Sequence, residues 1–167
     1  MNILVAGYRF LNEEDADPLR DDPPANDDGL WKKIWSLDCP NKVKHFLWRA
    51  CKNSLPSKSN LVRRKMIQDH TCDRCLGPSE SVIHALWSCL AIDFVWEETA
   101  CWDFRETEAF QNCSDLVAWI FRHDKQPELF SMIAWSIWTQ RNQIRTMQQH
   151  CSANQIAHVT RVKLEEV

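Results

Sequence analysis

The sequence has only three glycines and one tyrosine among its 167 residues, and it has no long hydrophobic run. So few glycines argue against a glycine-rich phosphate loop and against a turn-dense all-β fold. Residues 1–10 lack the basic start, apolar core and cleavage site of a signal peptide. The most apolar later stretch, residues 129–138, is too short to cross a bilayer. We therefore expect an intracellular protein, nuclear or cytoplasmic, that is neither secreted nor held in a membrane.

Cysteine and tryptophan, by contrast, are abundant, with eight and nine residues respectively. The apolar share of 44% and the charged share of 26% are ordinary for a folded protein. In a reducing compartment, clustered cysteines bind metal more often than they form disulfides. The cysteine spacing is therefore the first pattern to examine.

Four residues have the spacing of metal ligands: Cys72-x2-Cys75, then His84 after eight residues and Cys89 after four more. Cysteine and histidine are the usual zinc ligands, and four protein ligands make a closed, structural site for one Zn²⁺. Because five residues advance an α-helix by about 500°, His84 and Cys89 cannot share one helical face, and Cys89 is expected just past the helix end. Arg74 and the run Arg63–Lys65 could offset the negative charge of three thiolates. His70 is a weaker substitute ligand, and Cys72 and Cys75 as simple buried residues are the alternative.

The charge is strongly segregated, although the net charge is only −3. Residues 11–28 hold eight acids, one base and three prolines, which is typical of a flexible linker. Residues 31–65 hold ten bases and one acid among many aromatic residues. Such a segment can bind phosphates and stack bases. The candidate contacts with RNA or DNA are Lys42, Lys44, Trp48, Arg49, Lys52, Arg63, Arg64 and Lys65; in the alternative interpretation, the Trp side chains pack in the core and the lysines are merely solvated.

The hydrophobic periodicity predicts a mostly α protein: a small helical zinc-binding domain followed by a long C-terminal helical segment. After Pro40, the residues Val43, Phe46, Leu47 and Ala50 form a core stripe of a helix over 41–54. Further helices are expected from Ser57 to about Met66, over 80–87 with Ser79 as cap, over 91–98 and over 115–121. A long helix should start at Pro127 and reach Met147, and another is expected from Asn154.

These features together resemble the zinc-binding domain of plant LINE-type (non-LTR retrotransposon) reverse transcriptases. The resemblance rests on Leu30–Trp35, Pro40–Arg49, Leu55–Pro56, Leu61–Arg64, Glu80 and Trp96 together with the four spaced ligands. Gly7–Leu11 is similar to the end of that domain's N-terminal segment, and Trp135–Asn142 is similar to the connector before the ribonuclease H domain. The resemblance implies a partial N-terminal segment and linker at 1–29, the zinc-binding domain at 30–98 and a helical connector at 99–167.

The family implies nucleic acid as the partner and carries over Cys72, Cys75, His84 and Cys89 as zinc ligands. The polymerase's paired aspartates after tyrosine do not occur in this sequence, since Arg9 follows the single Tyr8, and the ribonuclease H carboxylate set is absent. We therefore expect a non-catalytic module without a small-molecule substrate, derived from a retrotransposon and truncated at both ends.

Two other classes remain open. A protein–protein module would use the zinc to hold its helices and would dock a partner through Trp135 and Trp138; an inert remnant would bind nothing. An enzyme would need either a reactive thiolate at Cys72 or Cys75 or an open metal position with a base such as Glu80. The closed ligand set argues against both enzymes, and Glu80 is expected in the first turn of the helix that carries His84.

Overall fold

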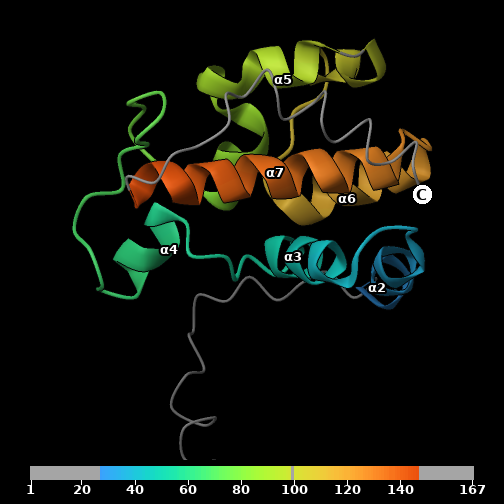
Figure 1. The fold of residues 1–167 in the computed structure, drawn as a ribbon, viewed down its shortest axis with the longest axis horizontal. Coiled ribbons are helices and arrows are strands. Elements are labelled where there is room, and N and C mark those ends of the chain that lie inside the picture. Colours follow the sequence, from blue (N-terminus) through green and yellow to red (C-terminus); the bar gives the residue numbers. More distant parts are fainter. Residues whose placement is uncertain (1–26, 99, 147–167) are drawn as a thin grey trace, which may run out of the picture.

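The computed structural model describes residues 27–98 and 100–146. These residues form helices and connecting turns and no strand, which confirms the expectation of a mostly α protein. In Figure 1, α2, α3 and α4 form a lower tier, α6 and α7 a middle tier, and α5 an upper tier. Most of the predicted N-terminal segment and the helix predicted from Asn154 lie outside the described residues. No described helix has the length and apolar character needed to span a membrane.

The lower tier consists of α2 (Asp27–Ser36), α3 (Asn41–Cys51) and α4 (Lys58–Arg63). Helix α3 begins directly after Pro40, and all four residues of its predicted stripe are buried. It ends before Asn53, which has a left-handed φ of 50°, a conformation that asparagine tolerates better than most residues. Helix α4 follows Ser57, as predicted, and the Ser57 hydroxyl caps it by accepting a hydrogen bond from the Asn60 N–H. It ends at Arg63, earlier than the sequence pattern indicated.

The segment after α4 differs most from the sequence expectation. The helix predicted over 80–87 begins later, at residue 82, and becomes the π-helix η1 (His84–Ser88). The serine hydroxyl that caps this helix belongs to Ser81 rather than to Ser79, since Ser81 Oγ accepts a hydrogen bond from the His84 N–H at 3.2 Å. The helix predicted over 91–98 is a 3₁₀ turn, η2 (Leu90–Ile92), followed by α5 (Asp93–Glu97). A 3₁₀ helix that the sequence did not suggest, η3 (Ala100–Glu106), follows.

The middle tier consists of α6 (Cys113–Arg122) and α7 (Pro127–Arg145). Both were predicted, and Pro127 stands in the first turn of α7, where its missing N–H costs nothing. Helix α7 packs against α3, η1 and α6, and Figure 1 shows it crossing the molecule between the lower and upper tiers. It therefore has a nearly continuous buried face, from Leu129 to Arg141.

One hydrophobic core joins all three tiers. It runs from Ile34 on α2 to Trp138 on α7, and the buried thiols of Cys72 and Cys89 belong to it. Its centre is aromatic: the ring of Trp96 lies 4.9 Å from that of Trp87 and 5.4 Å from that of Phe130. Residues on both sides of position 98 thus contribute to a single core, while the predicted domain boundary at 98 stays a prediction.

A buried ion pair connects α7 to the chain just before η1. The side chains of Glu80 and Arg141 are 0% and 2% exposed, and two nitrogens of the guanidinium donate to the two carboxylate oxygens. The same carboxylate accepts the Lys58 N–H, and Arg141 also donates to the Pro56 carbonyl. The sequence suggested that Glu80 stands in the first turn of a helix, and this prediction is wrong. The buried Glu80 carboxylate instead joins α4, η1 and α7.

We predict that Arg141→Met lowers the free energy of unfolding by about 3–5 kcal/mol, because it leaves the Glu80 carboxylate buried and unpaired. Adding Glu80→Gln to this variant should recover part of the loss, because no unpaired charge then remains in the core. Urea unfolding followed by circular dichroism measures both effects.

The matched control is Arg145→Met on the same helix. Arg145 is partly exposed and lies 3.9 Å from Asp73, so its removal should cost less than about 1 kcal/mol. Equal losses for Arg141→Met and Arg145→Met would contradict the structural role of the buried pair.

Candidate metal centre and basic surface

The four predicted ligands come together at one point, although they lie on separate parts of the chain. Cys72 and Cys75 lie on the loop after α4, His84 is the first residue of η1, and Cys89 follows its last residue. Their ligand atoms all lie within 4.8 Å of one another. The expectation that Cys89 lies just past the end of a helix is confirmed.

The π-helix explains how a spacing of five residues serves one site. In η1 the Cys89 N–H donates to the carbonyl of His84 at 3.0 Å, which is the i→i+5 hydrogen bond that defines a π-helix. This wider turn brings positions 84 and 89 to the same side, whereas an α-helix would separate them by about 140°. The spacing of His84 and Cys89 was evident in the sequence, whereas the π-helix was not predicted.

Two of the six separations between the ligand atoms match those of a tetrahedral zinc site, and all six are within 4.8 Å. Cys72 Sγ lies 3.9 Å from Cys89 Sγ, and Cys75 Sγ lies 3.3 Å from His84 Nε2. Bond lengths of about 2.3 Å to sulfur and 2.0 Å to nitrogen, at tetrahedral angles, require separations of about 3.8 and 3.5 Å. The arrangement can therefore hold one metal ion with only small adjustments, and His84 presents its Nε2 atom to it.

The pKa values of three of the four groups shift in different directions, although the groups share one site. Burial raises the pKa of the Cys89 thiol to about 12. Burial also raises the pKa of Cys75, but hydrogen bonds from the Gly77 N–H and from the neighbouring thiols outweigh it, so the net shift is downward. Burial and the nearby Arg74 charge lower the pKa of His84, which favours the neutral imidazole that a metal requires.

Arg74 supplies a positive charge beside the cluster, as the sequence analysis expected. Its Nη2 atom donates to the Ala85 carbonyl, but Nε and Nη1 are buried without a hydrogen-bond partner in the described part of the chain. Its charge lowers the pKa of both Cys89 and His84. Three thiolates, a neutral histidine and Zn²⁺ carry a net charge of −1, so these unpaired N–H groups have an obvious counter-charge when the metal is bound.

Gly77 allows the loop to close over the ligands. A methyl group built at this position would lie 3.1 Å from Cys75 Sγ and 3.8 Å from His84 Cε1. The Gly77 N–H itself donates to Cys75 Sγ at 3.4 Å. The glycine therefore serves a close approach of the backbone to a ligand sulfur rather than a special backbone dihedral.

The remaining candidate ligands lie elsewhere. His70 is exposed and its Nδ1 hydrogen bonds to the carbonyl of Pro78, so it is not part of the cluster. Cys39, Cys51, Cys101 and Cys113 lie outside the cluster, and Cys151 lies outside the described residues. Burial raises the pKa of the Cys113 thiol well above its usual value.

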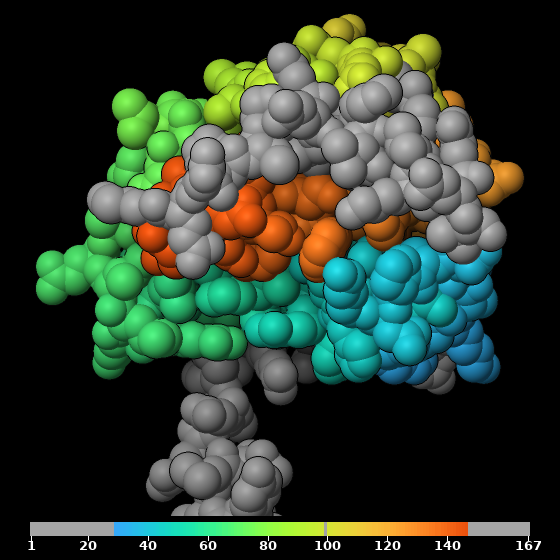
Figure 2. All heavy atoms as spheres, in the orientation of Figure 1, coloured from blue at the N-terminus to red at the C-terminus, as the bar shows by residue number. Residues whose placement is uncertain are grey.

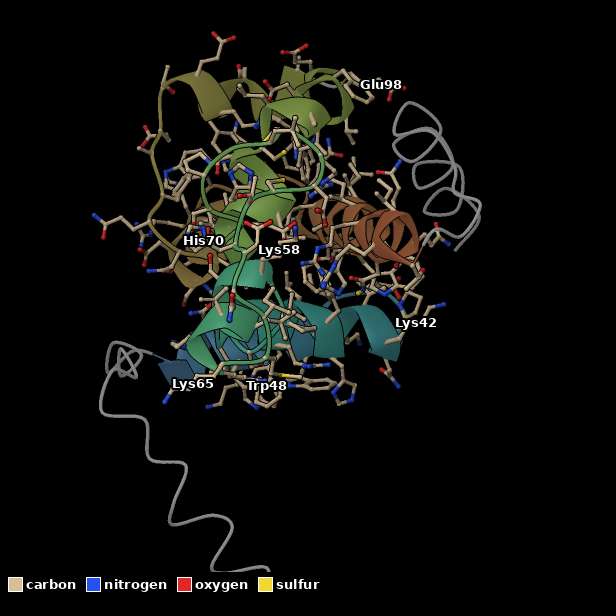
Figure 3. All side chains as sticks on the ribbon, turned by 90° about the vertical axis from the view of Figure 1, so that its left-hand side faces the viewer. Lys42, Trp48, Lys58, Lys65, His70 and Glu98 are labelled. Atoms are coloured by element: carbon tan, nitrogen blue, oxygen red, sulfur yellow. The ribbon has the colours of Figure 1, made fainter. Side chains whose placement is uncertain are left out.

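The predicted nucleic-acid residues do not all point the same way. The ammonium of Lys42 lies 4.5 Å from the ring centre of Trp135, and Lys44 donates to the Trp35 carbonyl. In Figure 3, Lys42 lies on the side of α3 nearest to α7, away from Trp48. The row Lys44–Trp48–Lys52 is therefore incomplete as a contact surface, because the first lysine is used within the fold.

The others lie on the lower tier, which Figure 2 shows as a continuous surface from blue to green. Arg49, Arg63, Arg64 and Lys65 are exposed, and Trp48 and Lys52 are half-buried. Figure 3 shows Trp48 and Lys65 along the same lower edge. Trp31, 36% exposed, adds an indole whose ring centre lies 5.3 Å from that of Trp48. We call this set the basic surface: Trp31, Trp48, Arg49, Lys52, Arg63, Arg64 and Lys65.

Comparisons with known proteins agree with this geometry. Residues 13–96 match the family model described as zinc-binding in reverse transcriptase, and the chain therefore belongs to this family of zinc-binding domains. The matched range contains all four clustered residues. Within the family, a related protein is one from Arabidopsis thaliana described as a predicted ribonuclease H protein, 28% identical over 74 residues. That match covers 44% of this chain and 12% of the relative, so the chain corresponds to a small part of it. No solved structure matches the chain.

We predict that Gly77→Ala weakens zinc binding by about tenfold, because the added methyl group displaces the Cys75 sulfur from its position in the cluster. Competition for zinc with a coloured chelator measures the change. Gly29→Ala is the matched control, since a methyl group there meets no atom within 4 Å. Unchanged zinc affinity in Gly77→Ala would show that the loop adapts and that this glycine is not required.

Proposed function

We propose that this chain is a non-catalytic, retrotransposon-derived module in which one structural zinc ion holds the helices and the basic surface contacts nucleic acid. The observation that carries the first half is the convergence of Cys72, Cys75, His84 and Cys89, whose ligand atoms lie within 4.8 Å of one another, in a zinc-binding family. Two of the four clustered residues, Cys72 and Cys89, are fully buried. A closed set of four protein ligands leaves no position for water or substrate, which supports a structural role over a catalytic one.

The zinc ion would join the loop after α4 to the two ends of η1. Within the loop, the Cys72 N–H donates to the Gly77 carbonyl at 3.0 Å. His84 and Cys89 bracket η1, which packs on α7. Metal binding thus supplies folding energy to this part of the chain.

We predict that the purified protein contains one equivalent of zinc and that Cys72→Ser/Cys75→Ser contains none. The variant should also lose cooperative unfolding, as the wild type should on adding a chelator. Metal analysis and thermal unfolding by circular dichroism measure this. Cys39→Ser/Cys101→Ser, which removes two thiols outside the cluster, should keep both zinc and stability. A metal-free wild type with full helical content would refute the proposal.

The second half of the proposal rests on the basic surface. Arg63, Arg64 and Lys65 form three consecutive exposed cations at the end of α4, and Arg49 is exposed on α3. Their charges suit phosphates, and the partly exposed rings of Trp31 and Trp48, 5.3 Å apart between ring centres, belong to the same tier. A surface with both cations and accessible indoles suits single-stranded nucleic acid, because bases stack on the rings while the backbone pairs with the cations.

We predict that the protein binds a single-stranded oligonucleotide with a steep loss of affinity as salt rises. Arg64→Gln/Lys65→Gln should weaken binding at low salt and reduce the slope of log affinity against log salt by about 2, which corresponds to two lost phosphate contacts. Fluorescence anisotropy with a labelled oligonucleotide measures both, and duplex DNA of the same sequence tests the preference for single strands.

The matched control removes one arginine and one lysine elsewhere: Arg122→Gln/Lys125→Gln, at the end of α6 and in the turn before α7. This variant should keep the wild-type slope. An equal loss for both pairs would mean that only the net charge matters. No binding at low salt would favour the protein–protein module or the inert remnant.

The protein–protein alternative finds less support at the residues first considered for it. Trp138 is buried, with its ring centre 6.4 Å from that of Phe46 and 4.6 Å from the Arg141 guanidinium. Trp135 is half-buried and faces the Lys42 ammonium. Neither residue offers the exposed aromatic anchor that such an interface requires.

A further inference from the structure

A hollow on the upper tier is used neither by the zinc centre nor by the basic surface. It has a volume of about 600 Å³ and is lined by residues of η1, α5, η3 and the turn that follows η3. Trp87, Trp96, Trp102 and Phe110 supply its aromatic wall. A volume of this size suits one or two large side chains of a bound peptide. We call it the upper groove.

The upper groove is strongly acidic. Residues 90–110 contain six acids and one base, Arg105. Asp93, Glu97, Asp103, Glu106 and Glu108 all line the groove, and the last four are exposed. Among the described residues, only Asp93 has an ion-pair partner in the groove. Figure 3 shows how the charges divide, with Glu98 at the upper end of the molecule and Lys65 at the lower end.

Arg105 shows what chemistry this groove favours. Its guanidinium carbon lies 5.2 Å from the ring centre of Trp87, and one nitrogen donates both to the Asp93 carboxylate at 2.7 Å and to the Trp87 carbonyl. A planar cation on an indole with a carboxylate at its edge is a favourable site for arginine, and less so for lysine. The chain satisfies one carboxylate in this way and leaves the others exposed.

A second observation points to a peptide rather than to a free cation. Trp102 lines the groove and is 2% exposed, yet its Nε1–H has no hydrogen-bond acceptor within the described residues. A buried indole N–H normally has a partner. Trp96, beside it, donates to the Leu86 carbonyl at 3.2 Å. A backbone carbonyl of a bound segment would give Trp102 the equivalent bond, and the exposed Leu90 and Phe94 would extend the apolar contact.

We propose that the upper groove binds an arginine-rich peptide segment of a partner protein. The arginine side chains pair with Glu97, Asp103 and the neighbouring acids, and a peptide carbonyl accepts the Trp102 N–H. The charge complementarity selects a basic segment, and a planar guanidinium, which can donate to both oxygens of one carboxylate, is favoured over the ammonium of lysine. The proposal is independent of the basic surface, which carries the opposite charge.

The test uses the zinc-loaded full chain and two probes, fluorescein-labelled hexa-arginine and hexa-lysine, in an anisotropy titration. Hexa-arginine is expected to bind at least fivefold more tightly than hexa-lysine.

Glu97→Gln/Asp103→Asn should weaken hexa-arginine binding about tenfold and leave oligonucleotide binding unweakened. Trp102→Phe, which removes the N–H and replaces the indole with a smaller aromatic ring, should weaken hexa-arginine binding severalfold with unchanged zinc content. Asp124→Asn/Glu128→Gln, two acids before and at the start of α7, is the control for net charge and should change it less than twofold.

Hydrogen exchange locates the peptide, because the acidic residues 11–28 could also attract it. Protection of residues 90–110 on adding hexa-arginine supports the proposal. Protection confined to residues 11–28, equal affinity for the two peptides, or equal losses in the two acid-to-amide variants would overturn it. Concentration-dependent self-association that hexa-arginine does not disrupt would show that a second copy of the chain covers the groove instead, which would also overturn it.

Discussion

The Glu80–Arg141 pair is the contact on which the arrangement of this molecule depends. It joins residues 61 positions apart, and within the core it is the point where α4, the entry to η1 and α7 meet. A buried ion pair is expensive, because both charges lose their water. Here the carboxylate also accepts the Lys58 N–H, and the guanidinium also donates to the Pro56 carbonyl and lies on the Trp138 ring. All of these contacts form together only when α7 takes one position along η1. The pair therefore determines the position of α7 along η1 more than it adds to the free energy of unfolding.

That position matters for the metal centre. His84 follows Glu80 by four residues, and the Glu80 backbone is held on both sides: its N–H donates to the His70 carbonyl and its carbonyl accepts the Ser59 N–H. The chain therefore enters η1 from a fixed point, and the π-helix then brings Cys89 to the same side as His84. A π-helix is a less favourable backbone than an α-helix, and it is stable here because Ala85, Leu86 and Trp87 are buried in the core. The aromatic core and the metal ligands thus depend on the same five residues.

The sequence predicted some of these features well because they are local. The stripe of α3, the start of α4 after Ser57 and the proline at the start of α7 each depend on neighbours within a few residues, and the four spaced ligands lie in one short stretch, residues 72–89. The errors came where distant residues decide. Glu80 follows a serine and precedes an apolar run, so it has the pattern of a first-turn acid, and only the position of Arg141 makes it a buried charge. Lys44 belonged by spacing to a row with Trp48 and Lys52, but in the fold it donates to the Trp35 carbonyl, and the ammonium of Lys42 lies on the Trp135 ring; whether either lysine contacts nucleic acid stays a prediction. The π-helix, likewise, follows from the packing of its apolar residues and not from their type.

The near-neutral total charge hides two patches of opposite charge. The exposed cations Arg63, Arg64 and Lys65 lie on the lower tier and the exposed acids Glu97, Asp103, Glu106 and Glu108 on the upper tier, with α7 between the two tiers. Interspersed charges would have served solubility equally well, so this division needs a further physical reason. At the scale of the screening length, about 8 Å at physiological salt, mixed charges cancel, whereas separated ones keep a local potential. A nucleic-acid contact on the lower tier would therefore not be weakened by the acids of the upper tier, and the upper groove could attract a basic segment without repulsion from Arg63, Arg64 and Lys65. The tiered fold thus allows one small zinc-binding module to present two electrostatically independent surfaces.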